Sequence, residues 1–160
     1  LAFADPATPG PPHRVSVDDW MIEACPHQGP ALAIDGAGGL HVAWFTAGRV
    51  RQGLFYARST DHGASFTPPL PIGTPHHAAG RATLLALGHT ILLAWKEMAG
   101  EGEAVYLMAS DDGGAHFAPP RRLARTTGDA DHPLLIADGQ TPYLSWLTGA
   151  EGYRLLPVAP

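Results

Sequence analysis

The stretch that decides the fold is STDHGASF at residues 59–66, because it recurs as SDDGGAHF at residues 110–117. Both copies follow the pattern Ser-x-Asp-x-Gly-x-x-Phe, and they begin 51 residues apart. Three tryptophans, Trp44, Trp95 and Trp146, are separated by the same step. Two kinds of landmark on one period indicate an internal repeat, whose unit is a supersecondary module that stacks on its neighbours.

Within each copy, the residue types suit a tight turn between two strands. The aspartate carboxylate accepts hydrogen bonds from backbone N–H groups, and the glycine adopts the positive φ that such a turn needs. The serine hydroxyl holds a further backbone group, and the phenylalanine packs beneath the hairpin. The residues with these structural roles are Ser59, Asp61, Gly63 and Phe66 in the first copy, and Ser110, Asp112, Gly114 and Phe117 in the second. Residues 66–70 and 117–120 are predicted to leave the turns as the next strand.

The pattern resembles the Asp-box, or bacterial neuraminidase repeat (BNR), of the sialidase-like β-propellers. That motif usually reads Ser/Thr-x-Asp-x-Gly-x-Ser/Thr-Trp/Phe. The first copy fits at every fixed position, while the second has His116 where Ser or Thr is usual. The resemblance implies an all-β fold, a β-propeller of four-stranded antiparallel blades. It also implies that the boxes are structural turns at the end of the propeller away from the active site.

Composition supports an all-β protein and excludes several classes of function. The 160 residues include 19 glycines and 16 prolines, which suits many short strands joined by turns, and no segment has a sustained helical period. The net charge of −5 and the absence of a basic cluster argue against a nucleic-acid partner. No apolar run approaches the length needed to span a membrane.

The repeat predicts about three blades in one propeller domain, whereas closed propellers usually have about four to eight. The resemblance implies six, so we expect the remaining blades to come from another chain or from a segment of a longer precursor. It also implies a periplasmic or secreted location, although Leu1–Pro12 does not have the pattern of a signal peptide. The predicted divisions are a connecting segment with the outer strand of a preceding blade (1–29), two blades with a box each (30–80 and 81–131), and an incomplete blade (132–160).

The chemistry is expected at the end opposite the boxes. In a four-stranded blade, that end gathers the loops between the second and third strands and the connections between blades, which lie nearest the central axis. Loops on a rigid scaffold commonly carry function. The connections contain four of the nine histidines, and Arg81 opens an inner strand. The tryptophans are interpreted as packing between blades.

Three functions fit these loops, and the first is a non-catalytic module that binds a glycan or small ligand. A polar pocket at the propeller axis would hold the ligand, with Arg81, His132 and Asp129 as the binding residues. A guanidinium group can make two parallel hydrogen bonds to a carboxylate.

The second function is an exo-sialidase-like glycoside hydrolase. The resemblance implies an arginine triad, a tyrosine nucleophile activated by glutamate, and an aspartate acid/base, which is an exception among glycosidases. The candidates here are Asp131, Glu97 and Tyr153. Pro30 and His132 occupy the repeat positions of Arg81 where further arginines would stand.

The third function is an exported metal-binding protein. A thiolate with several imidazoles favours copper or zinc as the cofactor. No short ligand motif of the CxxC or HExxH type is present. The candidate ligands are Cys25, His27, His76, His77 and His132.

Overall fold

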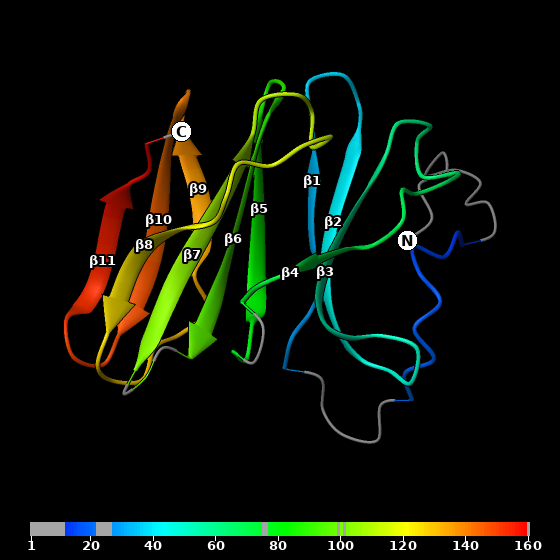
Figure 1. Ribbon diagram of the computed structural model, residues 1–160. Helices are drawn as coiled ribbons and strands as arrows, with labels where there is room; N and C mark the ends of the chain where they lie inside the picture. Colours follow the sequence, from blue (N-terminus) through cyan, green and yellow to red (C-terminus); the bar gives the residue numbers. More distant parts are fainter. Residues whose placement is uncertain (1–11, 22–26, 75–76, 99, 101, 160) are drawn as a thin grey trace.

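The computed structural model (Figure 1) describes residues 12–21, 27–74, 77–98, 100 and 102–159. All the regular structure in these residues is β, and no helix among them is long and apolar enough to cross a membrane. The strands, in chain order, are β1 (Ala31–Ile34), β2 (Leu40–Ala47), β3 (Gln52–Ser59), β4 (Leu70–Ile72), β5 (Gly80–Leu87), β6 (Thr90–Met98), β7 (Glu103–Ser110), β8 (Arg121–Thr126), β9 (Leu134–Asp138), β10 (Thr141–Thr148) and β11 (Gly152–Pro157).

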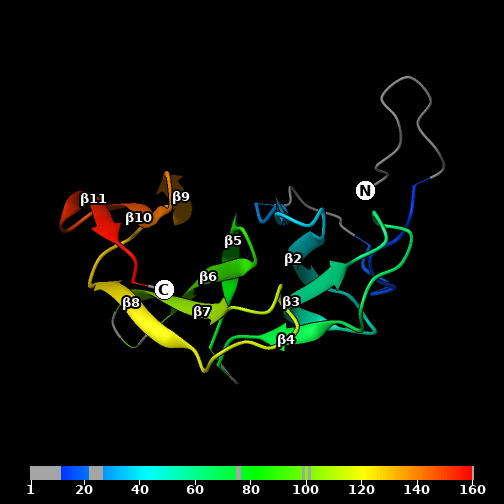
Figure 2. The ribbon, with the colours of Figure 1, turned by 90° about the horizontal axis from the view of Figure 1, so that it is seen from above.

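The strands form three antiparallel sheets in which neighbours in sequence are neighbours in space. Their orders are β1-β2-β3-β4, β5-β6-β7-β8 and β11-β10-β9. The sheets lie side by side as a fan, with β5 and β9 at one edge and β4 and β8 at the opposite edge (Figure 2). The predicted all-β class, with four-stranded antiparallel blades, is confirmed.

Two hydrophobic cores hold the sheets together, and β6 contributes to both. Ile91, Leu92, Leu93 and Ala94 are consecutive, and each is 0% exposed, because this strand is covered on both faces. Ile91 and Leu93 pack toward the first sheet, whereas Leu92 and Ala94 pack toward the third. The middle sheet is therefore fixed from both sides.

Trp95 and Trp146 belong to these two cores, whereas Trp44 lies outside them, and Trp44 and Trp146 tie their strands to connecting segments. Trp95 and Trp146 are 1% exposed, and Trp44 is half-buried. The indole N–H of Trp44 donates to Asp18 Oδ2 at 2.8 Å, and that of Trp146 donates to the Asp131 carbonyl at 3.1 Å. Each indole therefore adds a polar contact to its packing.

The two boxes close in the same way. In the first, the Gly63 amide donates to Ser59 Oγ, and the Ser65 amide donates to an oxygen of Asp61, both at 2.9 Å. The second box has the same two bonds at the same lengths, from the Gly114 amide to Ser110 Oγ and from the His116 amide to Asp112 Oδ1.

The strands that follow the boxes begin later than the sequence predicts. β4 starts at Leu70 and β8 at Arg121, directly after the proline pairs at 68–69 and 119–120. Proline has no backbone N–H to donate to a ladder, so pairing starts after each pair.

The segment before the first sheet also differs from expectation. Residues 12–21 contain no strand, although an outer strand of a preceding blade was predicted there. Asp19 has a φ of 54°, which interrupts an extended run. The segment instead receives bonds from the Arg49 and Val50 amides, to the carbonyls of Asp19 and Asp18 respectively.

Candidate functional site

The fold has two distinct ends, and the boxes mark one of them. The β1–β2 turn there meets the β5–β6 turn, because the Gly36 amide donates to the Gly88 carbonyl at 3.0 Å. The second box joins them through a bond from the Gly113 amide to the His89 carbonyl, also at 3.0 Å. The opposite end carries the β2–β3 and β6–β7 loops and the connections between sheets.

A buried polar chain stabilises the box end. His41, which is 1% exposed, contacts the Tyr56 hydroxyl at 2.7 Å through Nδ1 and Asp35 Oδ2 at 3.2 Å through Nε2. Burial raises the pKa of Asp35, but hydrogen bonds from the Gly39 amide, the His41 ring and the Ala37 amide outweigh it and hold that pKa below its ordinary value. Burial lowers the pKa of His41 and raises that of Tyr56. Since Tyr56 is only 2% exposed, this row of hydrogen-bonded side chains stabilises the interface between blades and is closed to substrates.

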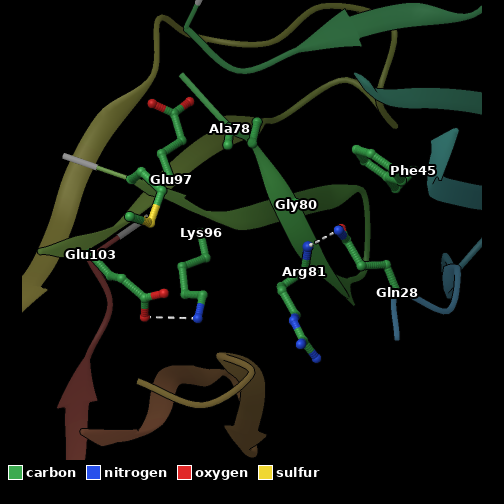
Figure 3. A pocket seen from close by; sticks show the side chains of 10 residues that line it. Gln28, Phe45, Ala78, Gly80, Arg81, Lys96, Glu97 and Glu103 are labelled. Carbon is green, nitrogen blue, oxygen red and sulfur yellow. Dashed lines mark hydrogen bonds and ion pairs between the residues drawn. The ribbon is translucent and has the colours of Figure 1, made fainter. Parts of the chain in front are cut away.

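A pocket of about 300 Å³ lies at the opposite end, between the first and second sheets (Figure 3). Phe45 reaches it from the first sheet, and Gln28 reaches it from the segment before that sheet. Lys96 and Glu103 reach it from the second sheet. The full lining is Gln28, Phe45, Ala78, Ala79, Gly80, Arg81, Lys96, Glu97, Met98 and Glu103. Two residues predicted from the sequence, Arg81 and Glu97, therefore share one pocket.

Arg81 is held in an unusual backbone conformation at this pocket. Its φ is 54°, and the pairing of β5 with β6 shifts register between Gly80 and Thr83. The Arg81 amide donates to Gln28 Oε1 at 3.2 Å, and a Cβ on Gly80 would collide with the same oxygen. Within the described residues the Arg81 guanidinium has no hydrogen-bond or ion-pair partner, so its five donors are available to a ligand.

Lys96 and Glu103 form an ordered polar wall. Their ammonium and carboxylate groups are 2.7 Å apart, and Lys96 Nζ also donates to the Ala130 carbonyl at 2.7 Å. The two side chains are 14% and 17% exposed, respectively. Figure 3 shows the ends of Arg81, Lys96 and Glu103 on one side of the pocket and Glu97 turned to the other.

Glu97 anchors the pocket wall. Its side chain is 0% exposed, and its carboxylate accepts from Trp95 Nε1 at 2.7 Å, the Thr74 amide at 2.8 Å and His77 Nδ1 at 3.2 Å. A buried carboxylate needs such donors, because otherwise burial would be very costly. Glu97 thereby ties β6 to the β4–β5 connection, which continues into Ala78–Arg81.

The other predicted binding and catalytic residues lie elsewhere at this end. Asp129 and Asp131 are exposed, and Asp131 Oδ1 accepts from the His132 amide at 2.7 Å. His132 donates from Nε2 to the Ala82 carbonyl at 3.2 Å. Tyr153 is 64% exposed on β11 and lies 3.2 Å from Ser145 Oγ, outside the lining of the pocket that contains Glu97.

The predicted metal ligands are only partly described. Cys25 and His76 lie outside the described residues, and His27 and His77 are exposed. In the parts of the chain that the structure describes, no three His, Cys, Asp or Glu side chains gather as a metal site would require.

Sequence reasoning missed two residues of the pocket, Gln28 and Phe45, because neither belongs to the repeated motif or to a charged loop. One usable signal was present. Positions 46, 97 and 148 are equivalent by the 51-residue step and hold Thr46, Glu97 and Thr148. A carboxylate where the other repeats carry a hydroxyl marks the second repeat as specialised.

Comparison with known proteins supports the fold alone. No protein-family model matches the chain, and no curated protein matches it in sequence. A solved structure that matches is an α-L-arabinanase from Penicillium chrysogenum in complex with arabinobiose. It shares 16% identity, with a TM-score of 0.55 over 83% of this chain and 49% of the arabinanase chain. The three sheets are therefore blades of a propeller-like fold, and this chain spans about half the length of that relative.

Proposed function

We propose that this chain is the sugar-binding part of an Asp-box β-propeller, and that it binds a glycan without cleaving it. The observation that carries this proposal is the pocket of Arg81. An unpaired guanidinium, an ordered Lys96–Glu103 pair and the ring of Phe45 face one cavity of about 300 Å³. Sugar hydroxyls both donate and accept, so they suit such mixed charges, and an aromatic face suits the C–H groups of a sugar ring.

The two carboxylates of the pocket support binding rather than catalysis. Glycoside hydrolysis generally needs one carboxyl group to protonate the leaving oxygen and a second, free carboxylate. Both oxygens of Glu97 already accept bonds from the protein, and Glu103 is paired with Lys96. Within the described residues Glu97 has no unpaired oxygen and Glu103 has only Oε1 unpaired, so the pocket lacks two free carboxyl groups.

The closing of both boxes by the same pair of bonds supports placing the chain with the Asp-box propellers. A glycan ligand and that resemblance together support a periplasmic or secreted location.

A glycan array that includes arabino-oligosaccharides and sialosides tests the proposal, followed by calorimetric titration with arabinobiose, the sugar bound by the arabinanase relative. We expect millimolar to micromolar binding that falls at least tenfold in Arg81→Ala. The matched control is Arg122→Ala, because Arg122 is exposed on β8 and lies outside the lining of this pocket. Absence of array signal, or equal loss in both variants, would contradict the proposal.

Hydrolysis is the second candidate, because two carboxylates line one pocket and the structural relative is an arabinanase. The same sugars are incubated with the protein and the products are separated by chromatography. Cleavage that is lost in Glu103→Gln would establish the hydrolase in place of the binding module.

We also propose that further blades complete the ring, from another chain or from a longer precursor. Both ends of the fan expose apolar side chains. Ile34 is 54% exposed on the first sheet, and Leu147 and Leu155 are 51% and 50% exposed on the third. Native mass spectrometry distinguishes a monomer from an assembly with a second polypeptide.

A further inference from the structure

A second cavity adjoins the sugar pocket. It has a volume of about 340 Å³ and lies between β2 and the segment 12–21. Phe45 lines both cavities, so its side chain is the wall they share. Each volume is near the lower end for small-ligand sites, and neither cavity alone suits an extended ligand.

Aromatic rings form one side of this second cavity. The rings of Trp20 and Phe45 meet edge to face, with centroids 5.9 Å apart, and Trp44 lies next along the lining. Trp20 and Phe45 are both half-buried, which leaves part of each ring open to a ligand. Rings exposed in this way bind apolar faces of a ligand at a low cost in conformational entropy.

Two carboxylates provide the polar side, and they have different roles. Asp18 is 12% exposed and accepts from Trp44 Nε1 at 2.8 Å and from Ser16 Oγ at 2.6 Å, so it builds the wall. Asp19 is 48% exposed, and its Oδ2 accepts from Arg49 at 3.0 Å in a solvent-exposed pair of little strength. The Asp19 carboxylate can therefore accept bonds from a ligand hydroxyl.

The fold holds this cavity in shape. The backbone of residues 18–20 passes so close to Gly48 that a Cβ there would collide with the Asp18 carbonyl. Bonds from the Arg49 and Val50 amides secure the same segment at 3.2 Å and 3.1 Å. The segment that carries Trp20 is thus fixed against the β2–β3 loop.

We infer that the second cavity, here called the Trp20 cavity, is a second sugar subsite. The ligand is then an oligosaccharide of at least two units that passes over Phe45. This inference rests on the proposed function, in which the Arg81 pocket binds the first unit. The Trp20 cavity, with stacking rings and Asp19 as the acceptor, binds the next unit.

The test measures affinity against chain length. Arabinose, arabinobiose and arabinotriose are titrated by calorimetry, or the corresponding series of whichever sugar gives the strongest array signal. We expect the disaccharide to bind at least tenfold more tightly than the monosaccharide. Trp20→Ala should weaken the disaccharide about tenfold and leave the monosaccharide unchanged, whereas Arg81→Ala should weaken both.

Two further variants guard against a trivial structural effect. Trp20→Phe keeps an aromatic ring and should retain part of the length dependence, and Tyr153→Ala removes an exposed ring on β11 and should change nothing. Equal affinity for one and two units, unaffected by Trp20→Ala, would overturn the second subsite and leave the proposed function intact. Failure of every sugar to bind would overturn both.

Discussion

The two ends of this propeller-like fold differ in how far their residues follow the repeat. At the box end, Ser59 and Ser110 accept the same amide bond at 2.9 Å, and the two box aspartates close the same loop. At the pocket end, repeat positions 46, 97 and 148 hold threonine, glutamate and threonine. Residues that recur maintain the scaffold, and residues that depart from the repeat define the site.

The carboxylates of the two ends also differ in environment. Those of the boxes are solvent-exposed and close their own turns, so each acts over a few residues. The Glu97 carboxylate is buried and joins a strand to a connection 20 and more residues away. Substitution of Glu97 should therefore destabilise a larger part of the structure than substitution of a box aspartate.

The largest expected effect comes from the contact of the second box with the first sheet. Gly114 has a φ of 76°, and a Cβ there would collide with the Tyr56 hydroxyl and crowd His41. Gly114→Ala should lower the free energy of unfolding by about 3 kcal/mol or more. Gly139 has a φ of 58° with no atom within 4 Å of an added Cβ, so Gly139→Ala should cost only about 1 kcal/mol. Urea denaturation measures both, and equal losses would contradict the interface contact.

The second effect concerns Glu97, which stands where the other two repeats have threonine. Glu97→Thr installs the residue of the neighbouring repeats and removes the acceptor for Trp95, Thr74 and His77. We expect a loss of about 2 to 4 kcal/mol in stability. Glu97→Gln keeps one acceptor oxygen and should lose about half as much. Hydrogen exchange at the Thr74 amide should accelerate more in Glu97→Thr than in Glu97→Gln; unchanged exchange would show that Glu97 does not hold the connection.

The third effect is the pH dependence of the stability that the box aspartates contribute. Hydrogen bonds from the Ser65 and Ser59 side chains lower the pKa of Asp61, and bonds from the His116 amide and ring lower that of Asp112. Because both folded-state values lie below the ordinary value of 3.8, the stabilisation is present above about pH 4 and is lost as the pH falls toward the folded-state pKa.

The double variant Asp61→Asn, Asp112→Asn should therefore reduce the fall of the urea midpoint between pH 5 and pH 2. The single exchange Asp111→Asn is the control, because Asp111 is an exposed residue of the same box whose carboxylate makes no hydrogen bond or ion pair within the described residues. A double variant with the same acid dependence as the original protein would contradict this role for the box carboxylates.

The smallest effect should be stabilising. His62 has a φ of 57° where the second box has Gly113, with a φ of 67°. A glycine meets no Cβ penalty in this conformation, so His62→Gly should raise stability by up to about 1 kcal/mol. The melting temperature measures the change, with His62→Ala as the control, because alanine removes the ring but keeps the Cβ. A fall in melting temperature for His62→Gly would show that the ring makes contacts that outweigh the strain.

The sequence predicted more of the fold than of the site. The turn chemistry of a box lies within eight consecutive residues, and its recurrence predicts the sheets without any knowledge of distant contacts. The late starts of β4 and β8 were not predicted, although the proline pairs at 68–69 and 119–120 have no backbone N–H to donate to a ladder. The irregular course of residues 12–21 was not, because it depends on Gly48 and the β2–β3 loop.

The site depended on arrangements that no local pattern encodes. Arg81 and Glu97 were predicted from their place in connections and loops, but nothing in their neighbourhood links them to Gln28 or Phe45. Gln28 lies 53 residues from Arg81 in sequence and contacts it only because the first two blades pack together.

The sequence by itself determined that this protein is built from antiparallel blades of one repeated plan, because a turn motif that recurs at a fixed spacing is a local and periodic signal. Only the tertiary structure decided which departures from the repeat act together. The packing of the first two sheets brings Phe45, Arg81 and Lys96 to one pocket, and the burial of Glu97 turns a loop carboxylate into its anchor. Contacts between sheets are set by three-dimensional packing and not by spacing along the chain.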